Sequence, residues 1–563
     1  MKNKIWLYWF IPLIVSILYI DSFLRLNTNL ITVFDEGFYY LSIWKIKHGI
    51  INEGLSLWAL MVDAICSEKI TSSILNLRYV RFFFQITSIG IFAIISLFYL
   101  VKKRILDSFI EYVLYLSLVF WLGYSTLGDK IITYNELQSS FLSLIIGSFL
   151  LSTVYQTSKR FLLYIIIGFF SFLSFVTIPP SGVLISISIL ILLGVQYWSQ
   201  KKKMIYIFLF FLLGFIISAL CIHFFILDLK LVFHNMLVST NKISNSNRGY
   251  DPISLAINLM FYFRDFFIIT CLLLGVSFLY INLNKFTKYW VACLFFLFSV
   301  IILVFYQKKP IMALSTIWAF PFLLFVLWKF TNRPISSINS FFTFDVLIKV
   351  FLFLSPLISA IGTNTDLSGK MILFILPWSV LFAELFNGIR SEREKLKWIV
   401  IVCLSIMIFQ PVKTITIGFK TKMANYYFNE YKPISGIKLN KPQFEYFNRI
   451  NQIFKNYSYK AEKDVIFATT FDHMTICAFD AIPCETYQVP NDFIGERDKN
   501  KLAKPDFIFL DKYDYDMMSD SIKSLGWGFP EDYDKYFVGT PDQGIQWDNQ
   551  RWLYCLKVKR NLN

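Results

Sequence analysis

Two adjacent carboxylates, Asp35 and Glu36, are the first candidates for chemistry in this sequence. They follow the first apolar run, residues 5–20, by a short stretch that places them near a membrane–water boundary. An ionisable pair beside hydrocarbon is costly unless it is hydrated, paired or functional. Because partial desolvation and a second acid both raise the pKa of a carboxyl group, such a group can take a proton from an attacking acceptor. The alternative interpretation is a pair of solvated loop acids.

A second polar segment, residues 128–136, reads Gly-Asp-Lys-Ile-Ile-Thr-Tyr-Asn-Glu. It brings Asp129 and Glu136 to the same side of the membrane as Asp35, with Tyr134 and Asn135 as further candidates for binding a substrate. Alternatively, Asp129 and Lys130 form a local ion pair worth less than about 1 kcal/mol.

Several cations lie on the outer side, against the usual excess of Lys and Arg on the cytoplasmic side. They are Arg78, Arg81, Arg248, Arg264, Lys308, Lys309 and Lys370. Arg78 and Arg81 precede the second apolar run, and Lys308 and Lys309 cap an outer helix end. These four are the preferred ligands for a phosphate, with Arg248 as a further candidate for substrate binding. Others in the set are expected to be ordinary snorkelling residues.

The composition places these groups in a membrane protein. Of the 563 residues, 56% are hydrophobic, 19% aromatic and 16% charged, and the mean hydropathy is +0.55. A net charge of +16 does not indicate nucleic acid, because many cations lie in short loops between apolar runs. Residues 1–412 are a succession of apolar runs, whereas residues 413–563 carry charges, prolines and turns at ordinary density.

The apolar runs predict about thirteen membrane spans, since roughly 20 helical residues cross the hydrocarbon. They are 5–20, 82–101, 109–127, 139–157, 161–178, 182–198, 204–227, 266–283, 289–306, 311–329, 341–361, 371–389 and 398–412. With Lys2 and Lys4 in the cytoplasm, alternate loops carry basic clusters such as residues 102–104 and 201–203. The N-terminus is therefore expected in the cytoplasm and residues 413–563 outside the inner membrane.

The outer parts have predicted structure of their own. Loop 21–81 contains amphipathic stretches with Trp44 and Trp58 that suit a helix lying in the membrane interface. Residues 464–470, 505–511 and 552–558 read as short buried strands, and residues 441–456 as a helix, which predicts a small α/β domain. Cys477 and Cys484 are either a disulfide or two buried thiols. The predicted fold is a polytopic α-helical membrane protein with a C-terminal soluble α/β domain.

This layout resembles the C-type (GT-C) glycosyltransferases, and within them the bacterial lipid A aminoarabinose transferases and, more distantly, the protein O-mannosyltransferases. The residues that carry the resemblance are Asp35, Glu36 and Tyr39 in the long first outer loop. The resemblance implies transfer of a sugar from a polyprenyl phosphate to an acceptor of the cell envelope, with Asp35 as the catalytic carboxylate. It also implies a second acid in loop 128–138, where both Asp129 and Glu136 match and Asp129 is preferred.

Further expectations depend on the same outer cavity. Asn364 and Asp366, in a turn after the eleventh run, could bind sugar hydroxyls. No cofactor is required, although a divalent metal is compatible with the acids, and no metal ligand is assigned. The expected partners are the lipid-linked donor, membrane lipid and the envelope acceptor. The competing functions are an envelope oligosaccharide polymerase or ligase, and a transporter or flippase of lipid-linked sugars.

Overall fold

The described residues of the chain form two compact units. The computed structural model describes residues 5–26, 35–47, 57–126, 131–155, 160–226, 228–230, 232–234, 343–361, 372–386, 424–468, 473–484, 504–511, 515–516, 520, 522–523, 525–539 and 551–557. One unit groups residues 1–19, 84–127 and 134–413, and the other groups residues 20–83, 128–133 and 414–563. The expected domain division at residue 412 stays a prediction.

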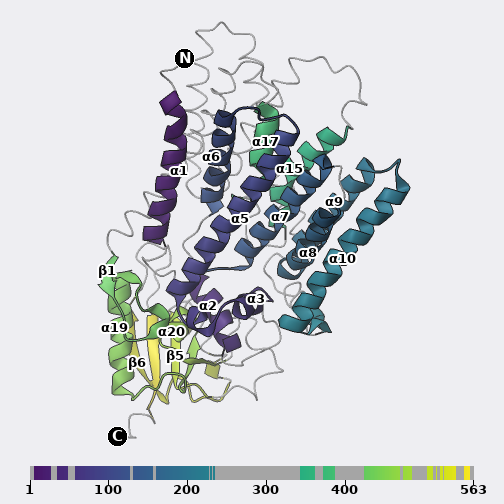
Figure 1. Cartoon of the computed structure of the whole chain (residues 1–563). Coiled ribbons are helices and arrows are strands. Elements are labelled where there is room, and N and C mark those ends of the chain that lie inside the picture. The colour runs from purple at the N-terminus through teal and green to yellow at the C-terminus, as the bar shows by residue number, and fades with distance from the viewer. Residues whose placement is uncertain are drawn as a thin grey trace. The chain divides into compact units, whose positions relative to one another are not determined.

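The first unit is helical throughout its described part (Figure 1). Its elements, two of which extend into the second unit, are α1 (Ile5–Leu26), α5 (Ile74–Lys102), α6 (Phe109–Thr126), α7 (Tyr134–Val154), α8 (Arg160–Thr177), α9 (Pro179–Gln196), α10 (Lys201–Phe225), α15 (Phe344–Ala360), η3 (Ile372–Phe374) and α17 (Pro377–Phe386). Helices α5, α7, α8, α9 and α10 are long and apolar enough to cross a membrane. The predicted total of about thirteen spans is untested, because runs 266–283, 289–306, 311–329 and 398–412 lie outside the described residues.

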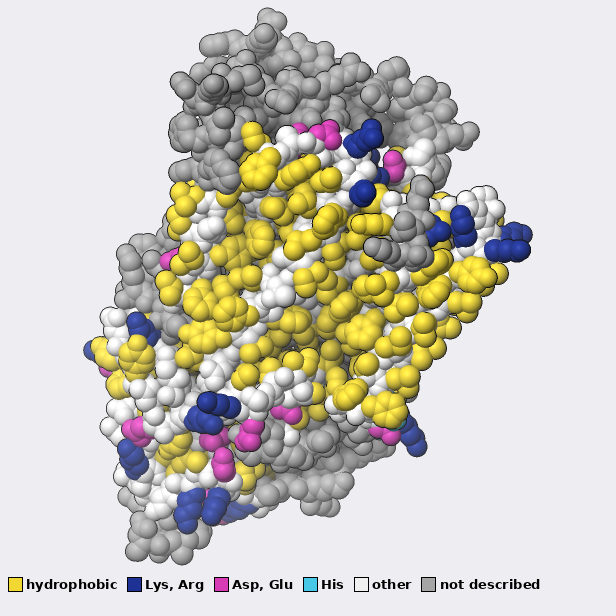
Figure 2. All heavy atoms as spheres, in the orientation of Figure 1, with side chains coloured by type: hydrophobic (Ala, Val, Ile, Leu, Met, Phe, Trp, Pro, Cys, Tyr) yellow, Lys and Arg dark blue, Asp and Glu magenta, His cyan; other side chains and the backbone are white. Residues whose placement is uncertain are grey.

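The outward faces of α9 and α10 are apolar. Ile187 and Ile191 on α9 and Phe208, Leu209 and Leu213 on α10 are among the exposed large hydrophobic residues. Figure 2 shows hydrophobic side chains spread over much of the helical surface. A soluble protein rarely exposes so large an apolar surface. These faces are therefore expected to contact lipid.

Helices α8 and α10 approach each other backbone to backbone. A Cβ placed on Gly168 would lie 1.9 Å from the carbonyl oxygen of Phe211, and one on Gly214 would lie 1.9 Å from that of Ile165. Small residues permit this close packing between membrane helices, where dispersion replaces the hydrophobic effect as the driving force.

Polar side chains join the helices inside this unit. Gln138 of α7 donates from Nε2 to Ser174 Oγ of α8 at 2.8 Å and to Ser181 Oγ of α9 at 2.9 Å. Ser139 donates to the carbonyl oxygen of Leu373 at 2.6 Å. Buried polar groups of this kind are tolerated because their hydrogen bonds are made within the protein.

A cluster of charges lies at the end of α5 that carries the predicted cytoplasmic cluster 102–104. Glu384 of α17 is buried, with Lys103 Nζ at 3.4 Å and Lys349 Nζ at 3.6 Å from its carboxylate oxygens. Tyr99 donates to the same carboxylate at 2.5 Å, and Lys103 also pairs with Asp345 at 3.0 Å. The cluster ties α5, α15 and α17 together, and no pattern in the sequence predicted it.

The second unit contains short helices and two small sheets. Its remaining elements are α2 (Asp35–Lys47), α3 (Leu57–Ile65), α4 (Glu68–Thr71), β1 (Ala424–Tyr427), η4 (Lys432–Ile434), β2 (Lys438–Asn440), α19 (Lys441–Asn456), β3 (Val465–Ala468), α20 (His473–Ala478), β4 (Ile482–Pro483), β5 (Phe507–Asp511), β6 (Tyr533–Gly539) and β7 (Arg551–Leu556). Strands β1 and β2 form an antiparallel pair. The larger sheet has the order β4-β3-β5-β7-β6, parallel from β4 to β5 and antiparallel from β5 onward. The three predicted strands and the predicted helix are confirmed.

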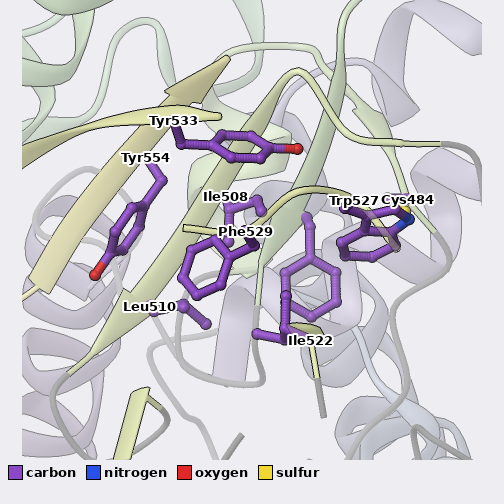
Figure 3. Packing of buried hydrophobic residues seen from close by; sticks show 9 residues of the cluster. Cys484, Ile508, Leu510, Ile522, Trp527, Phe529, Tyr533 and Tyr554 are labelled. Carbon is purple, nitrogen blue, oxygen red and sulfur yellow. The ribbon is translucent and has the colours of Figure 1, made fainter. Parts of the chain in front are cut away.

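Both faces of the central strand β5 are covered. Ile508 and Leu510 pack on one face with Trp527, Phe529 and other residues of a buried cluster (Figure 3). On the other face, the ring centroid of Phe507 lies 4.6 Å from the ring centroid of Phe454 on α19. Continuous apolar sequence is typical of a strand buried on both sides. Cys484 belongs to the first cluster, and both Cys477 and Cys484 are buried thiols in the structure.

Helix α2, in the segment predicted to be the first outer loop, packs on α20 of the C-terminal part (Figure 1). Tyr40, Leu41, Ile43 and Trp44 are all buried, and so is Trp58 of α3. The prediction that these stretches lie in the membrane interface is therefore wrong for the two tryptophans. Their apolar faces contact protein, which an amphipathic pattern alone does not distinguish from lipid.

Candidate functional site

The candidate base, Asp35, is the first residue of α2. On a repeat of 3.6 residues per turn, positions 36, 40 and 44 share one side of the helix and position 35 falls on the opposite side. Tyr40 and Trp44 mark the side that packs on α20. Position 35 therefore lies on the side of α2 turned away from α20, and position 36 lies on the side that faces α20, a distinction that the dipeptide alone did not give.

Tyr39 lies one turn after Asp35 and packs against the first loop's second helix. Its ring meets that of Trp58 edge to face, with centroids 5.7 Å apart. Aromatic pairs in this geometry contribute about 1 kcal/mol beyond their buried area. Tyr39 is thus part of the packing between α2 and α3, whatever it does for a substrate.

Arg78 and Arg81 precede the apolar run 82–101, as predicted, but they already lie inside its helix. Helix α5 begins at Ile74, eight positions before the predicted start of this span at residue 82. Arg78 is 1% exposed and Arg81 3%. A snorkelling arginine would keep its guanidinium at the lipid headgroups, so this alternative does not describe either residue.

The two arginines open a polar stripe along the buried side of α5. Gln85 and Ser88 follow at helical spacing, and both are buried. Ser88 donates back to the carbonyl oxygen of Phe84 at 2.8 Å. Farther along, the same side carries Phe92 and then the buried Ser96. Cations buried in a membrane helix are costly and mark functional positions by default. The spacing 78, 81, 85 and 88 was the signal in the sequence that could have revealed the stripe.

The first turn of α7 contains three of the predicted residues. Tyr134 begins the helix, and Asn135 and Glu136 are 5% and 7% exposed. An acid in the first turn also interacts favourably with the helix dipole, so Glu136 has a structural explanation beside the functional one. The choice between Glu136 and Asp129 as the second acid stays open.

The other predicted residues lie outside the described part of the chain. They are Asp129, Arg248, Lys308, Lys309, Asn364 and Asp366, while Asp35 and Glu36 are described by their backbone alone. Within the described residues, no group of three or more His, Cys, Asp or Glu side chains could hold a metal ion. Two acids of the C-terminal part that resemble a metal-binding pair, Asp532 and Asp534, contact protein groups instead: Asp532 pairs with Lys504 at 2.8 Å, which lowers the pKa of Asp532, and Asp534 accepts a hydrogen bond from Tyr457.

Comparison with known proteins gives similarity to solved structures alone. No family model matches the chain, and no curated protein matches it. The matching structures include several of an oligosaccharyltransferase from Archaeoglobus fulgidus. Its complex with zinc and sulfate has a TM-score of 0.47 at 11% identity, covering 94% of this chain and 72% of that one. Its complex with an inhibitory peptide and a dolichol-phosphate has a TM-score of 0.44 at 11% identity, covering 97% and 75%. TM-scores below 0.5 at this identity do not establish a common fold. The function proposed for this chain is therefore based on its own residues.

Proposed function

We propose that this chain is an inverting membrane glycosyltransferase. It transfers a sugar from a polyprenyl phosphate to an acceptor of the cell envelope, on the outer face of the inner membrane, with Asp35 as the base. The proposal is supported by the resemblance in layout and by an acid at the start of α2. The observation that carries it is the burial of Arg78 and Arg81 on a polar stripe of an otherwise apolar helix.

The chemistry fits these groups. The carboxylate of Asp35 takes a proton from the acceptor's hydroxyl or amine as that atom bonds to the anomeric carbon from the face opposite the phosphate. The bond between the anomeric carbon and the phosphate oxygen breaks, and its electron pair leaves with the polyprenyl phosphate. The leaving group therefore gains negative charge during the reaction. Guanidinium groups held in a protein interior stabilise such charge strongly, because they are already oriented and only weakly screened.

Reconstituted vesicles separate this function from transport. Purified protein is inserted in vesicles that contain a radiolabelled polyprenyl-phosphate sugar, and an envelope extract supplies the acceptor. A transferase moves the labelled sugar to the acceptor, so the label is no longer attached to polyprenyl phosphate. A flippase changes only the leaflet in which the intact labelled lipid is found, and that result would refute the proposal.

A polymerase or ligase predicts a different donor requirement. Such an enzyme consumes a lipid-linked oligosaccharide and not a polyprenyl-phosphate monosaccharide. Parallel vesicles with each type of donor therefore distinguish the two enzymes. Consumption of the oligosaccharide alone would exclude the donor proposed here.

A further inference from the structure

Helix α2 depends on the packing around it. It has 13 residues, and isolated helices shorter than about 12–15 residues are marginal in water. Its buried side, with Tyr40 and Trp44, packs on α20. Burial raises the pKa of Tyr40 well above its ordinary value, and nearby Cys477 and Asp480 add to the shift. The order of the helix that begins at Asp35 thus depends on the C-terminal part of the chain as well as on α3.

One hydrogen bond fixes the register of this packing. Trp44 donates from its indole Nε1 to Asp480 Oδ1 at 2.8 Å, across 436 positions of sequence. Asp480 is the second residue after α20, and its carbonyl oxygen accepts the backbone N–H of Glu462 at 2.7 Å. Trp44 lies nine positions after Asp35, or about 14 Å along a helix that rises 1.5 Å per residue. A shift at Trp44 is therefore carried along α2 to the residue that begins it.

The backbone of Asp480 makes its side chain notable. Its φ is +55°, and it is the left-handed residue of a Schellman motif: Ala481 N–H bonds to Ile476 O at 3.0 Å and Asp480 N–H to Cys477 O at 3.2 Å. Glycine is the residue that such a position favours, because it has no Cβ to clash. An aspartate here is conformationally costly, and the contact that its carboxylate makes is with the outer loop.

We infer that the C-terminal domain is a positioning element for the catalytic helix, and that Asp480 and Trp44 are the positioning residues that hold Asp35 in place. This inference rests on the proposed function for its consequence in catalysis. Its structural part concerns only contacts within one compact unit.

Asp480→Gly is the informative substitution. Glycine suits the left-handed backbone, so the C-terminal domain keeps or gains thermal stability while the contact with Trp44 is lost. We expect kcat for sugar transfer to fall about tenfold to hundredfold, the scale of a base misplaced by about 1 Å, with little change in donor KM. Asp480→Asn keeps an acceptor oxygen and tolerates this backbone, so it should restore most of kcat.

A matched control exists at the end of α19. Ser458 is exposed, has φ +51° and occupies the same place in a second Schellman motif, where Tyr459 N–H bonds to Phe454 O at 3.0 Å. Ser458→Gly should give a similar gain in stability with wild-type kcat. Trp44→Phe removes the donor of the same hydrogen bond, the indole N–H. Because both substitutions break one contact, kcat of the double variant Trp44→Phe/Asp480→Gly should be no lower than that of the slower single variant.

Hydrogen exchange gives a readout that does not depend on activity. In full-length protein, amides of residues 36–47 should exchange faster in Asp480→Gly than in wild type, while strands β3 and β5 keep their protection. Unchanged exchange in residues 36–47 together with wild-type kcat would overturn the inference. Retained transfer in Asp35→Asn would overturn the proposed function instead. The exchange experiment would still test whether Asp480 orders α2, because it does not measure activity.

Discussion

At the scale of single residues, burial separates the two kinds of cation that the sequence could not distinguish. Arg78 and Arg81 looked like other basic residues near helix ends, yet both are almost fully buried. A buried guanidinium is held in one orientation by its surroundings, and its planar donors fit a phosphate. Their burial was not predicted, because helix α5 starts at Ile74, within a segment that is less apolar than the rest, although the spacing 78, 81, 85 and 88 fits one side of a helix.

Arg78→Lys tests the role of that guanidinium. Lysine keeps the charge and loses the planar pair of donors that fits a phosphate. We expect kcat/KM for the lipid-linked donor to fall about 100-fold, or about 2.7 kcal/mol, most of it in kcat because charge builds up on the leaving phosphate. Steady-state kinetics with varied donor measure this. Arg104→Lys, at an exposed position after α5, is the control.

An unchanged kcat/KM in Arg78→Lys, with the control also unchanged, would contradict a phosphate-binding role. Arg78 would then be a structural residue whose charge is satisfied by the protein alone.

At the scale of elements, long apolar runs and capped helices were predictable. The runs 109–127 and 161–178 correspond to α6 and α8, and the predicted helix 441–456 is α19. An N-cap marks the start of α19: the side chain of Asn440 accepts the backbone N–H of Gln443 at 2.9 Å. Strand β6 was missed, because its sequence YDKYFVG lies at the sheet edge and mixes charged with apolar residues.

The packing of α2 on α20 could not be predicted from either segment. The sequence predicts an amphipathic stretch around Trp44, but lipid and protein both cover an apolar side equally well. The contact joins residues 436 positions apart, so no local pattern records it. The candidate base could therefore be identified from its position after the first apolar run. Its supporting residues Trp44 and Asp480 could be identified only from the structure.

The close approach of α8 and α10 predicts a large difference between two glycine substitutions. Gly168→Ala would force a Cβ against a carbonyl oxygen 1.9 Å away, so the helices must separate. We expect a loss of about 2 kcal/mol of stability, typical of overpacking. Gly194→Ala, in α9 with no atom within 4 Å of the added Cβ, should be neutral or stabilising. Thermal unfolding in detergent measures both, and equal midpoints for the two variants would contradict this packing.

At the scale of the whole molecule, the proposed function depends on which side of the membrane each loop occupies. The excess of basic residues in alternate loops predicts that residue 202 lies in the cytoplasm and residue 458 outside. Lys202 and Ser458 are both exposed, so cysteines placed there are accessible to a reagent. In intact cells, an impermeant maleimide should label Ser458→Cys and not Lys202→Cys, with the parent protein as the blank.

The opposite labelling pattern would place α2 and the C-terminal domain in the cytoplasm. The outer face would then hold neither the candidate base nor the domain that positions it, and the proposed donor would have to be sought on the inner side.

The most direct measurement is transfer by purified Asp35→Asn protein, with Glu68→Gln as the control. Asparagine has nearly the shape of aspartate but cannot take the acceptor's proton, and Glu68 is an exposed acid elsewhere in the same loop. We predict that Asp35→Asn binds the polyprenyl-phosphate sugar with wild-type affinity and loses transfer by at least about 1000-fold, while Glu68→Gln stays active. Wild-type transfer by Asp35→Asn would contradict the central claim that this carboxylate is the base.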